Sequence, residues 1–206
     1  MTLPDGYSEI APGKLASVVT CLEMRAAAPL GPVRADPAWS LRRVVDADVD
    51  AYRSLFARVG REWLWFSRLV MPADELRRIL ADPDDEVWFF SVGGTDEGLL
   101  ELDFRETGQC ELAFFGLTEA ARGRGAGRWL MNRAIERAWS RPIERLWVHT
   151  CTLDHPAALD FYRRSGFRPY ARRVEVADDP RLVGLLPRDA APGIPIVEPD
   201  RNSAEP

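Results

Sequence analysis

The sequence contains few residues of the types that bind metal ions or form disulfide bonds. It has two histidines and three cysteines in 206 residues, and the cysteines (Cys21, Cys110 and Cys151) are far apart. Their spacing matches neither a disulfide framework nor a zinc site, so we expect free thiols, buried, in a reducing compartment. With so few histidines, we also expect no metal cofactor.

Long apolar runs are also missing. No stretch approaches the roughly 18 apolar residues that a membrane span requires, which predicts no membrane association. The first 14 residues, MTLPDGYSEIAPGK, lack a basic start followed by an apolar run, so we expect no secretory signal and a cytoplasmic location. A net charge of −5 and an isoelectric point of about 5.2 argue against broad binding of nucleic acid.

What the chain does contain is enough apolar material for one domain, since 46% of its residues are hydrophobic and no internal repeat is visible. We expect an N-terminal strand and connector over residues 1–40, a core over 41–177 and a tail over 178–206. The tail is rich in proline, and we expect it to be partly disordered, with residues 201–206 in that state.

Hydrophobic periodicity and turn residues predict a mixed α/β protein with helices covering a twisted sheet. Strands are expected over 16–26, 86–94, 98–106, 108–118, 143–152 and 167–176. Helices are expected from Asp46 or Asp48 to about 60, over 72–82, 126–139 and 154–166, the last with Asp154 as its N-cap. An aromatic stretch, REWLWFSRLVM, lies between the first two helices.

The most informative stretch is AARGRGAGRWLMNRAIERAW, residues 120–139, where glycines and arginines alternate just before a helix. We name residues 122–128 the glycine-arginine loop. A helix N-terminus carries free N–H donors and partial positive charge, and glycines let a ligand approach the backbone closely. Arginines beside them complete a site for phosphate, most naturally a diphosphate. The loop lacks the Gly-Lys-Ser/Thr ending of a Walker A motif and the third glycine of a Rossmann fingerprint.

This segment resembles the GNAT (Gcn5-related N-acetyltransferase) superfamily, whose signature R/Q-x-x-G-x-G/A stands here as Arg122-Gly123-Arg124-Gly125-Ala126-Gly127. A second segment, LWVHTCTLDHPAALDFYRRSGF, is similar to the family's strand and helix that end in a tyrosine and a Gly-Phe pair. The resemblance implies a single-domain, largely antiparallel twisted sheet flanked by helices, with a splayed strand pair at the cofactor site. It also implies acetyl-CoA as co-substrate.

The resemblance further assigns the cofactor-binding residues. The loop would hold the pyrophosphate of coenzyme A, and backbone groups near Phe115 and Leu117 would hold the pantetheine arm. The full set is Phe115, Leu117, Arg122, Gly123, Arg124, Gly125, Ala126, Gly127, Arg128 and His155. His155 stands where many relatives carry asparagine, and imidazole can donate a similar hydrogen bond; the alternative is a capping or solvent-exposed histidine.

The implied reaction needs a base, because an alkylammonium is mostly charged at neutral pH. Glu111 is the candidate, since some relatives have a glutamate at this point of the strand; a solvent-facing strand residue is the alternative. By strand alternation we expect Glu111 to share a face with Ala113 and Phe115. Glu101 and Asp103 are other acidic candidates. His149 could face the acceptor, or could be a histidine that only packs within its strand.

Tyr162 is the candidate acid, because the family places a tyrosine near the sulfur of coenzyme A. A phenol is a weaker acid than a thiol, so a hydrogen bond to developing thiolate is the alternative to full proton transfer. A third possibility is a tyrosine that only packs in the core.

The acceptor is less defined by the sequence. Trp63, Trp65 and Phe66 could form an apolar pocket for an amine, or could pack in the core or at a subunit contact. We expect an N-acetyltransferase acting on a primary amine of a small molecule or peptide. The alternatives are a non-catalytic acyl-CoA sensor and a nucleotide-binding module. The aromatic stretch also leaves a homodimer as one option.

Overall fold

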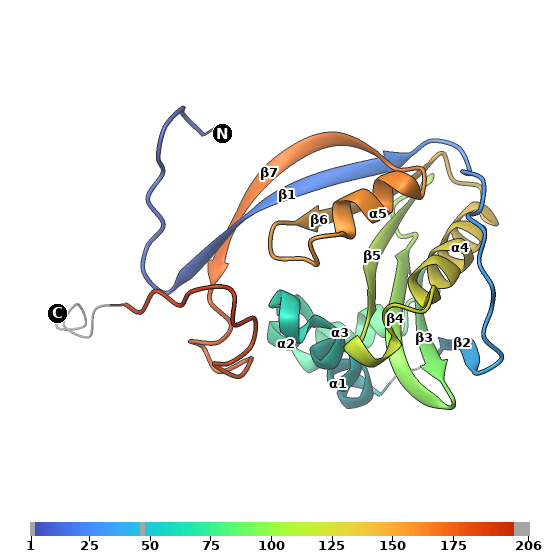
Figure 1. Ribbon diagram of the computed structural model, residues 1–206, viewed down its shortest axis with the longest axis horizontal. Helices are drawn as coiled ribbons and strands as arrows, with labels where there is room; N and C mark the ends of the chain where they lie inside the picture. Colours follow the sequence, from blue (N-terminus) through green and yellow to red (C-terminus); the bar gives the residue numbers. More distant parts are fainter. Residues whose placement is uncertain (1–2, 46–47, 200–206) are drawn as a thin grey trace.

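One mixed sheet of seven strands organises the protein in the computed structural model, which describes residues 3–45 and 48–199 (Figure 1). The strand order is β2-β3-β4-β5-β6-β1-β7, and all neighbours are antiparallel except β5 and β6. The strands are β1 (Lys14–Met24), β2 (Trp39–Val44), β3 (Asp85–Val92), β4 (Thr95–Asp103), β5 (Gln109–Leu117), β6 (Arg145–Cys151) and β7 (Arg168–Asp178). This confirms the predicted fold class.

Helices cover both faces of this sheet. They are α1 (Val49–Gly60), α2 (Ser67–Val70), α3 (Ala73–Leu80), α4 (Ala126–Trp139) and α5 (Ala158–Arg164), with short 3-10 turns η1 (Arg61–Trp63) and η2 (Glu119–Ala121). Buried side chains of α1 and α3 pack with those of β3 and β4 on one face. On the other face, α4 and Tyr162 of α5 pack with β4, β5, β6 and β1. No helix in the described ranges has the length and apolarity to cross a bilayer.

The first residues of α1 and α5 show whether the N-caps predicted from the sequence are correct. Asp48 caps α1, because its carboxylate accepts the backbone N–H of Asp50 at 3.0 Å; the alternative cap, Asp46, lies outside the described residues. The predicted cap Asp154 is wrong, since α5 begins at Ala158. Asp154 instead accepts the N–H of Cys151 at 2.9 Å and the hydroxyl of Thr150 at 2.7 Å. Its carboxylate therefore stabilises the turn after β6.

Two irregularities open the sheet at its centre. β5 and β6 pair only over Gln109–Glu111 and Arg145–Trp147, so the two strands separate beyond Glu111. β5 also contains a bulge, because consecutive residues Glu101 and Leu102 of β4 pair with Phe114 and Leu112. Ala113 is the extra residue. The sheet therefore contains the splayed strand pair that the family resemblance implied.

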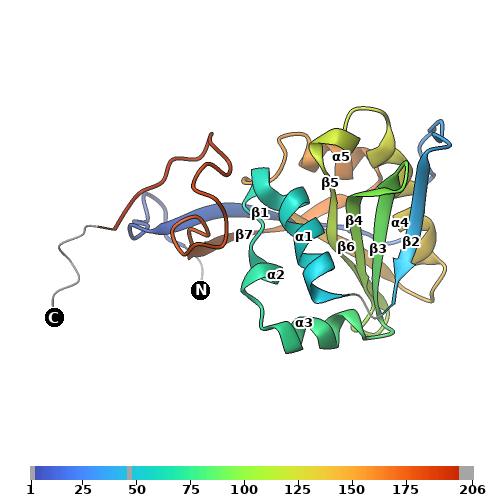
Figure 2. The same cartoon turned by 90° about the horizontal axis from the view of Figure 1, so that it is seen from below.

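The other end of the molecule is a long two-stranded ribbon. β1 and β7 pair from Lys14–Asp178 to Glu23–Arg168, and their far ends extend beyond the rest of the sheet (Figures 1 and 2). The segment after β7 folds back: Arg181 is buried and donates to carbonyls of Ala190 and Ile194. Apolar side chains of this segment pack around Leu64. The disorder expected for residues 201–206 concerns residues outside the described range.

Candidate active site

A cavity of about 680 Å³ lies where β5 and β6 separate. It is bounded by the α1–α2 connection, the C-terminal half of β5, the end of β6 and one side of α5. Of the main catalytic and cofactor-binding candidates, eight line the cavity: Glu111, Phe115, Leu117, Arg122, Gly123, Gly127, His155 and Tyr162. Two segments far apart in the sequence therefore meet at one opening in the sheet.

The backbone of the glycine-arginine loop is shaped by glycine. Gly123 and Gly125 have φ angles of 88° and 86°, in the left-handed region that other residues rarely adopt. Gly125 directly precedes α4 as its N-cap residue, so the free N–H groups of the first turn follow it. A Cβ at Gly127 would lie 3.9 Å from Leu117 and 4.0 Å from Phe161, in ordinary contact. Neither strain nor crowding within the chain requires glycine at 127, which fits a backbone left bare for a ligand.

The arginines of this loop have different surroundings. Arg122 forms an ion pair with Glu62 and lies over the ring of Trp63, 5.5 Å from its centroid. Arg124 is exposed at the loop tip. Arg128 points to α5, where it donates to the hydroxyl of Ser165 at 2.9 Å. Burial lowers the pKa of Arg128. The cavity is thus lined by Arg122 but not by Arg124, Ala126 or Arg128.

The bulge at Ala113 decides which way β5 directs its side chains. Beyond it, Phe115 points to the α4 and α5 face, where it stacks on Phe161 with ring centroids 5.7 Å apart. Phe114 instead joins the α1 side, where Glu111 also lies through its pairing with Asp103. The prediction that Glu111 and Phe115 share a face of the sheet is therefore wrong, because the one extra residue reverses the alternation of side chains between the two faces.

Glu111 and His149 form a pair across the opening between β5 and β6. Nδ1 of His149 lies 3.3 Å from Oε1 of Glu111, and both side chains border the cavity. The hydrogen bond to Glu111 raises the pKa of His149, with smaller contributions from the charges of Glu111, Asp154 and Glu175. The imidazole side chain is 49% exposed and the carboxylate side chain 23%, so the histidine is the more accessible partner.

The two other acidic candidates have different positions. Glu101 is fully buried and binds the hydroxyl of Tyr52 at 2.5 Å and the guanidinium of Arg68. It therefore has no access to an acceptor and stabilises the packing of α1 and α2 on the sheet. Asp103 borders the cavity, but Arg105 donates to both of its oxygens, at 2.9 and 2.5 Å. Glu111 is the least constrained of these carboxylates.

Tyr162 is buried on α5, in contact with three phenylalanine rings. The centroids of Phe115, Phe161 and Phe167 lie 6.3, 5.8 and 5.8 Å from its own. Tyr162 therefore packs in the core, which was the third possibility for it. Its side chain also borders the cavity. Burial, followed by the charge of Asp154, raises the pKa of Tyr162 above its usual value. A phenol in this state is a hydrogen-bond donor and a poor proton source.

Aromatic side chains from the α1–α2 connection reach across the opening. The indole N–H of Trp65 donates to Oδ1 of Asp154 at 3.2 Å, and its ring packs against Gly60 and Gly116. Trp63 meets His155 edge-on, with ring centroids 5.1 Å apart. Nδ1 of His155 accepts the N–H of Ala157 at 3.1 Å, which leaves Nε2 as the donor of the ring. Trp63, Trp65 and Phe66 all border the cavity.

The cavity is also lined by charged residues that no sequence pattern indicated as part of a site: Arg68, Arg105, Asp154, Arg164 and Glu175. They come from separate elements, and only the folded chain brings them to one surface. Asp154 alone carried a signal, since an aspartate after a strand often accepts backbone N–H groups in a turn. Within residues 3–45 and 48–199, no group of three or more His, Cys, Asp or Glu could hold a metal ion. All three cysteines are free, and Cys151 is only partly buried.

Comparisons with known proteins agree with this architecture. A family model described as the acetyltransferase (GNAT) family matches residues 52–167. A mycothiol acetyltransferase of Jonesia denitrificans is 35% identical over 77 residues, which are 37% of this chain and 24% of that protein. The chain therefore spans only about a quarter of that relative's length.

Solved structures resemble the fold at low sequence identity. A GCN5-related N-acetyltransferase from Sphaerobacter thermophilus has a TM-score of 0.58 at 17% identity, over 79% of this chain and 52% of that one. An aminoglycoside acetyltransferase from an uncultured soil metagenomic sample, in complex with trehalose, has a TM-score of 0.51 at 16% identity. The match covers 63% of this chain and 88% of that one. Because the family model covers more than half of the chain, this protein belongs to the GNAT acetyltransferase family.

Proposed function

We propose that this protein transfers an acetyl group from acetyl-CoA to the primary amine of a small molecule. The observation that carries this proposal is the single cavity that joins the glycine-arginine loop to the Glu111–His149 pair and to Tyr162. The loop residues fit a diphosphate, because bare backbone at Gly127, free N–H groups and Arg122 come together there. Arg124 at the exposed tip adds positive charge to the entrance.

The base in this proposal is the Glu111–His149 pair. With Nδ1 bonded to Glu111, the neutral imidazole has its lone pair on Nε2, which takes the proton of the incoming ammonium. Glu111 holds the ring in this tautomer and stabilises the imidazolium that results. Glu111, the candidate base from the sequence, is therefore the carboxylate of a two-residue base in this proposal.

The separated strands supply the other groups that the reaction needs. Beyond Glu111, β5 no longer pairs with β6, so backbone N–H groups on that side can bind the pantetheine arm and the carbonyl oxygen of the acyl group. Tyr162 donates a hydrogen bond to the departing sulfur. Its raised pKa favours hydrogen bonding over full proton transfer.

The acceptor in this proposal binds at the end of the cavity near Asp103 and His149. The wall is aromatic, with Trp65 and Phe66, and the base faces it. Two similar proteins are named for acetyl transfer involving mycothiol and aminoglycosides. Their low identity or short overlap leaves the acceptor of this protein to experiment.

The test is an amine panel incubated with acetyl-CoA and the full chain, with free thiol as the readout. We expect thiol release that depends on the amine and that falls strongly in the His149→Gln variant. Calorimetry with acetyl-CoA on the same samples separates binding from chemistry. Tight binding with no amine-dependent thiol release would favour the sensor alternative, and no binding would remove the proposal.

A further inference from the structure

The β1–β7 ribbon exposes an apolar surface that the fold leaves uncovered. On its outer face, Val18, Val174 and Val176 are 43%, 47% and 49% exposed. Val18 is paired with Val174, so these side chains are adjacent on the same face. Burying each valine against a partner would be favourable, because about 25 cal/mol is gained for each Å² of apolar surface removed from water.

β7 is also an open edge of the sheet. In the strand order it has β1 on one side and no neighbouring strand on the other among the described residues. The backbone N–H and C=O of Val18 point away from β7 and bond to Thr152. The N–H donates to the Thr152 hydroxyl at 3.1 Å, and the carbonyl accepts the Thr152 N–H at 3.1 Å. The Val18–Val174 pair is therefore a non-hydrogen-bonded pair, and the N–H and C=O of Val174 point to the open edge.

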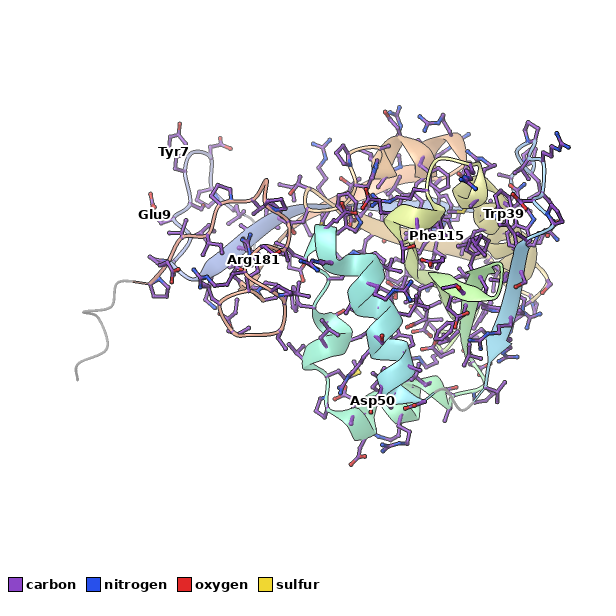
Figure 3. All side chains as sticks on the ribbon, turned by 60° about the horizontal axis from the view of Figure 1, so that its bottom comes forward. Tyr7, Glu9, Trp39, Asp50, Phe115 and Arg181 are labelled. Carbon is purple, nitrogen blue, oxygen red and sulfur yellow. The ribbon has the colours of Figure 1, made fainter. Side chains whose placement is uncertain are left out.

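The N-terminal segment adds further apolar surface at this end. Leu3, Tyr7 and Ile10 are 61%, 102% and 38% exposed, and residues 3–12 are exposed throughout. Figure 3 shows Tyr7 on a segment that projects away from the body, beside the ribbon. Exposed apolar side chains concentrated in one region mark an interaction surface.

We propose that the occupant of this surface is a second copy of the chain, paired antiparallel through β7 with the two-fold axis at Val174. In this register Arg173 of each copy lies opposite Glu175 of the other. Moving the axis to either neighbouring residue would place Arg173 opposite Arg173 or Glu175 opposite Glu175. Opposite charges on facing residues stabilise a strand pair and like charges destabilise it, so the charges favour this register over those two neighbours.

The same register connects the interface to the cavity. Arg173 and Glu175 alternate with Val174, so they point to the opposite face of the ribbon, where Glu175 borders the cavity. The second copy thus contributes its Arg173 beside Glu175 at the rim. The aromatic stretch that suggested a dimer from the sequence is not this interface, since Trp63 and Trp65 border the cavity.

Sedimentation velocity of the full chain tests the proposal, over a series of concentrations. We expect a dimer for the natural sequence and a dissociation constant about 100-fold higher for Val174→Asp, since both copies lose a buried valine and gain a carboxylate. Val70→Asp is the matched control, because Val70 is 52% exposed on α2 and lies outside the ribbon. A monomer at all concentrations, or a dimer unaffected by Val174→Asp, would overturn the proposal.

A cross-link tests the register without depending on stability. Val174→Cys should form an intermolecular disulfide under mild oxidation, because facing residues of a hydrogen-bonded antiparallel pair have Cα atoms about 5.5 Å apart. Val70→Cys and the natural sequence should not cross-link. Absence of the Val174→Cys dimer band would contradict the register. These readouts do not involve acetyl transfer, so they stand or fall separately from the proposed function.

Discussion

Nδ1 of His149 lies 3.3 Å from Oε1 of Glu111 where β5 and β6 separate. The two residues come from strands that are parallel neighbours only as far as Glu111. Their contact therefore marks the point at which the sheet opens, and it positions a more exposed imidazole over the cavity. This contact is the reason for proposing the pair as the base, since a strand carboxylate alone would be an ordinary surface group.

The pH dependence of the reaction should report this contact. His149 must be neutral to accept a proton, so kcat/KM should fall as the pH drops through its raised pKa. Glu111→Gln removes the interaction that raises this pKa, so the acid limb should move to lower pH while the plateau rate decreases. His149→Gln should lower the rate about 100-fold.

The control for these rates is Asp74→Asn, which changes a carboxylate whose side chain is 91% exposed on α3. It should leave both the rate and the acid limb unchanged. A Glu111→Gln profile whose acid limb stays at the original pH would show that the pair does not act as the base.

Gly127→Ala should change stability and cofactor binding in opposite directions. The new methyl group meets only ordinary contacts and replaces a glycine in the first turn of α4, so stability should rise by about 0.5–1 kcal/mol. The same methyl group narrows the approach to the backbone, and acetyl-CoA affinity should fall at least about 10-fold. Thermal unfolding and calorimetric titration measure the two effects.

Gly125→Ala is the comparison for this loop. Its φ of 86° is costly for alanine by about 1–2 kcal/mol, so this variant should lose stability and binding together. If Gly127→Ala binds acetyl-CoA as well as the natural protein does, the ligand does not approach the backbone at this position.

Tyr162→Phe should separate turnover from binding. The ring contacts with Phe115, Phe161 and Phe167 remain in the variant, so the fold and the affinity for acetyl-CoA should be nearly unchanged. Loss of the hydroxyl should lower kcat about 10-fold or more, through the missing hydrogen bond to the sulfur. Steady-state kinetics with an amine found in the panel gives the answer, and an unaltered kcat would leave Tyr162 as a core residue.

Asp85 should make the protein less stable as the pH rises. Burial, reinforced by the charges of Glu101 and Asp103, raises the pKa of Asp85 to about 8 in the folded state. An unfolded aspartate has a pKa of about 3.9, so the folded state binds the extra proton between these values. Stability is therefore lost progressively as the pH increases from about 4 to about 8.

Asp85→Asn removes this titration. Its free energy of unfolding relative to the natural protein should increase between about pH 5 and about pH 8, as measured by urea denaturation at each pH. A difference that stays constant over this range would show that Asp85 titrates normally. Among the ion pairs of the described residues, the cation nearest to the Asp85 carboxylate is the guanidinium of Arg105, whose Nη2 lies 3.8 Å from Oδ2.

The sequence predicted the parts of the fold that depend on local pattern. Strand alternation and helical periodicity placed six of the seven strands and the helices α1, α3 and α4 near their observed positions. β2 (Trp39–Val44) was missed, because it is a short edge strand in which exposed Arg42 and Arg43 interrupt the alternation. Its pairing with β3 is a long-range interaction that no local pattern encodes.

In the candidate site too, local features were predicted from the sequence and long-range contacts were not. The sequence predicted a loop whose glycines leave the backbone bare, but it did not predict which of them adopt left-handed φ angles, 123 and 125. The sequence did not predict three further features of the site: the bulge at Ala113, the Glu111–His149 contact and the Trp65–Asp154 hydrogen bond. Each depends on how strands and loops distant in sequence pack together, which the residue pattern of one strand does not determine.

A crystal structure of the protein bound to acetyl-CoA is the decisive experiment for the glycine-arginine loop. We expect phosphoryl oxygens within hydrogen-bond distance of backbone N–H groups between Gly123 and Arg128, with the thioester between Tyr162 and the Glu111–His149 pair. Phosphoryl groups bound at any other part of the surface would exclude this loop as the diphosphate site.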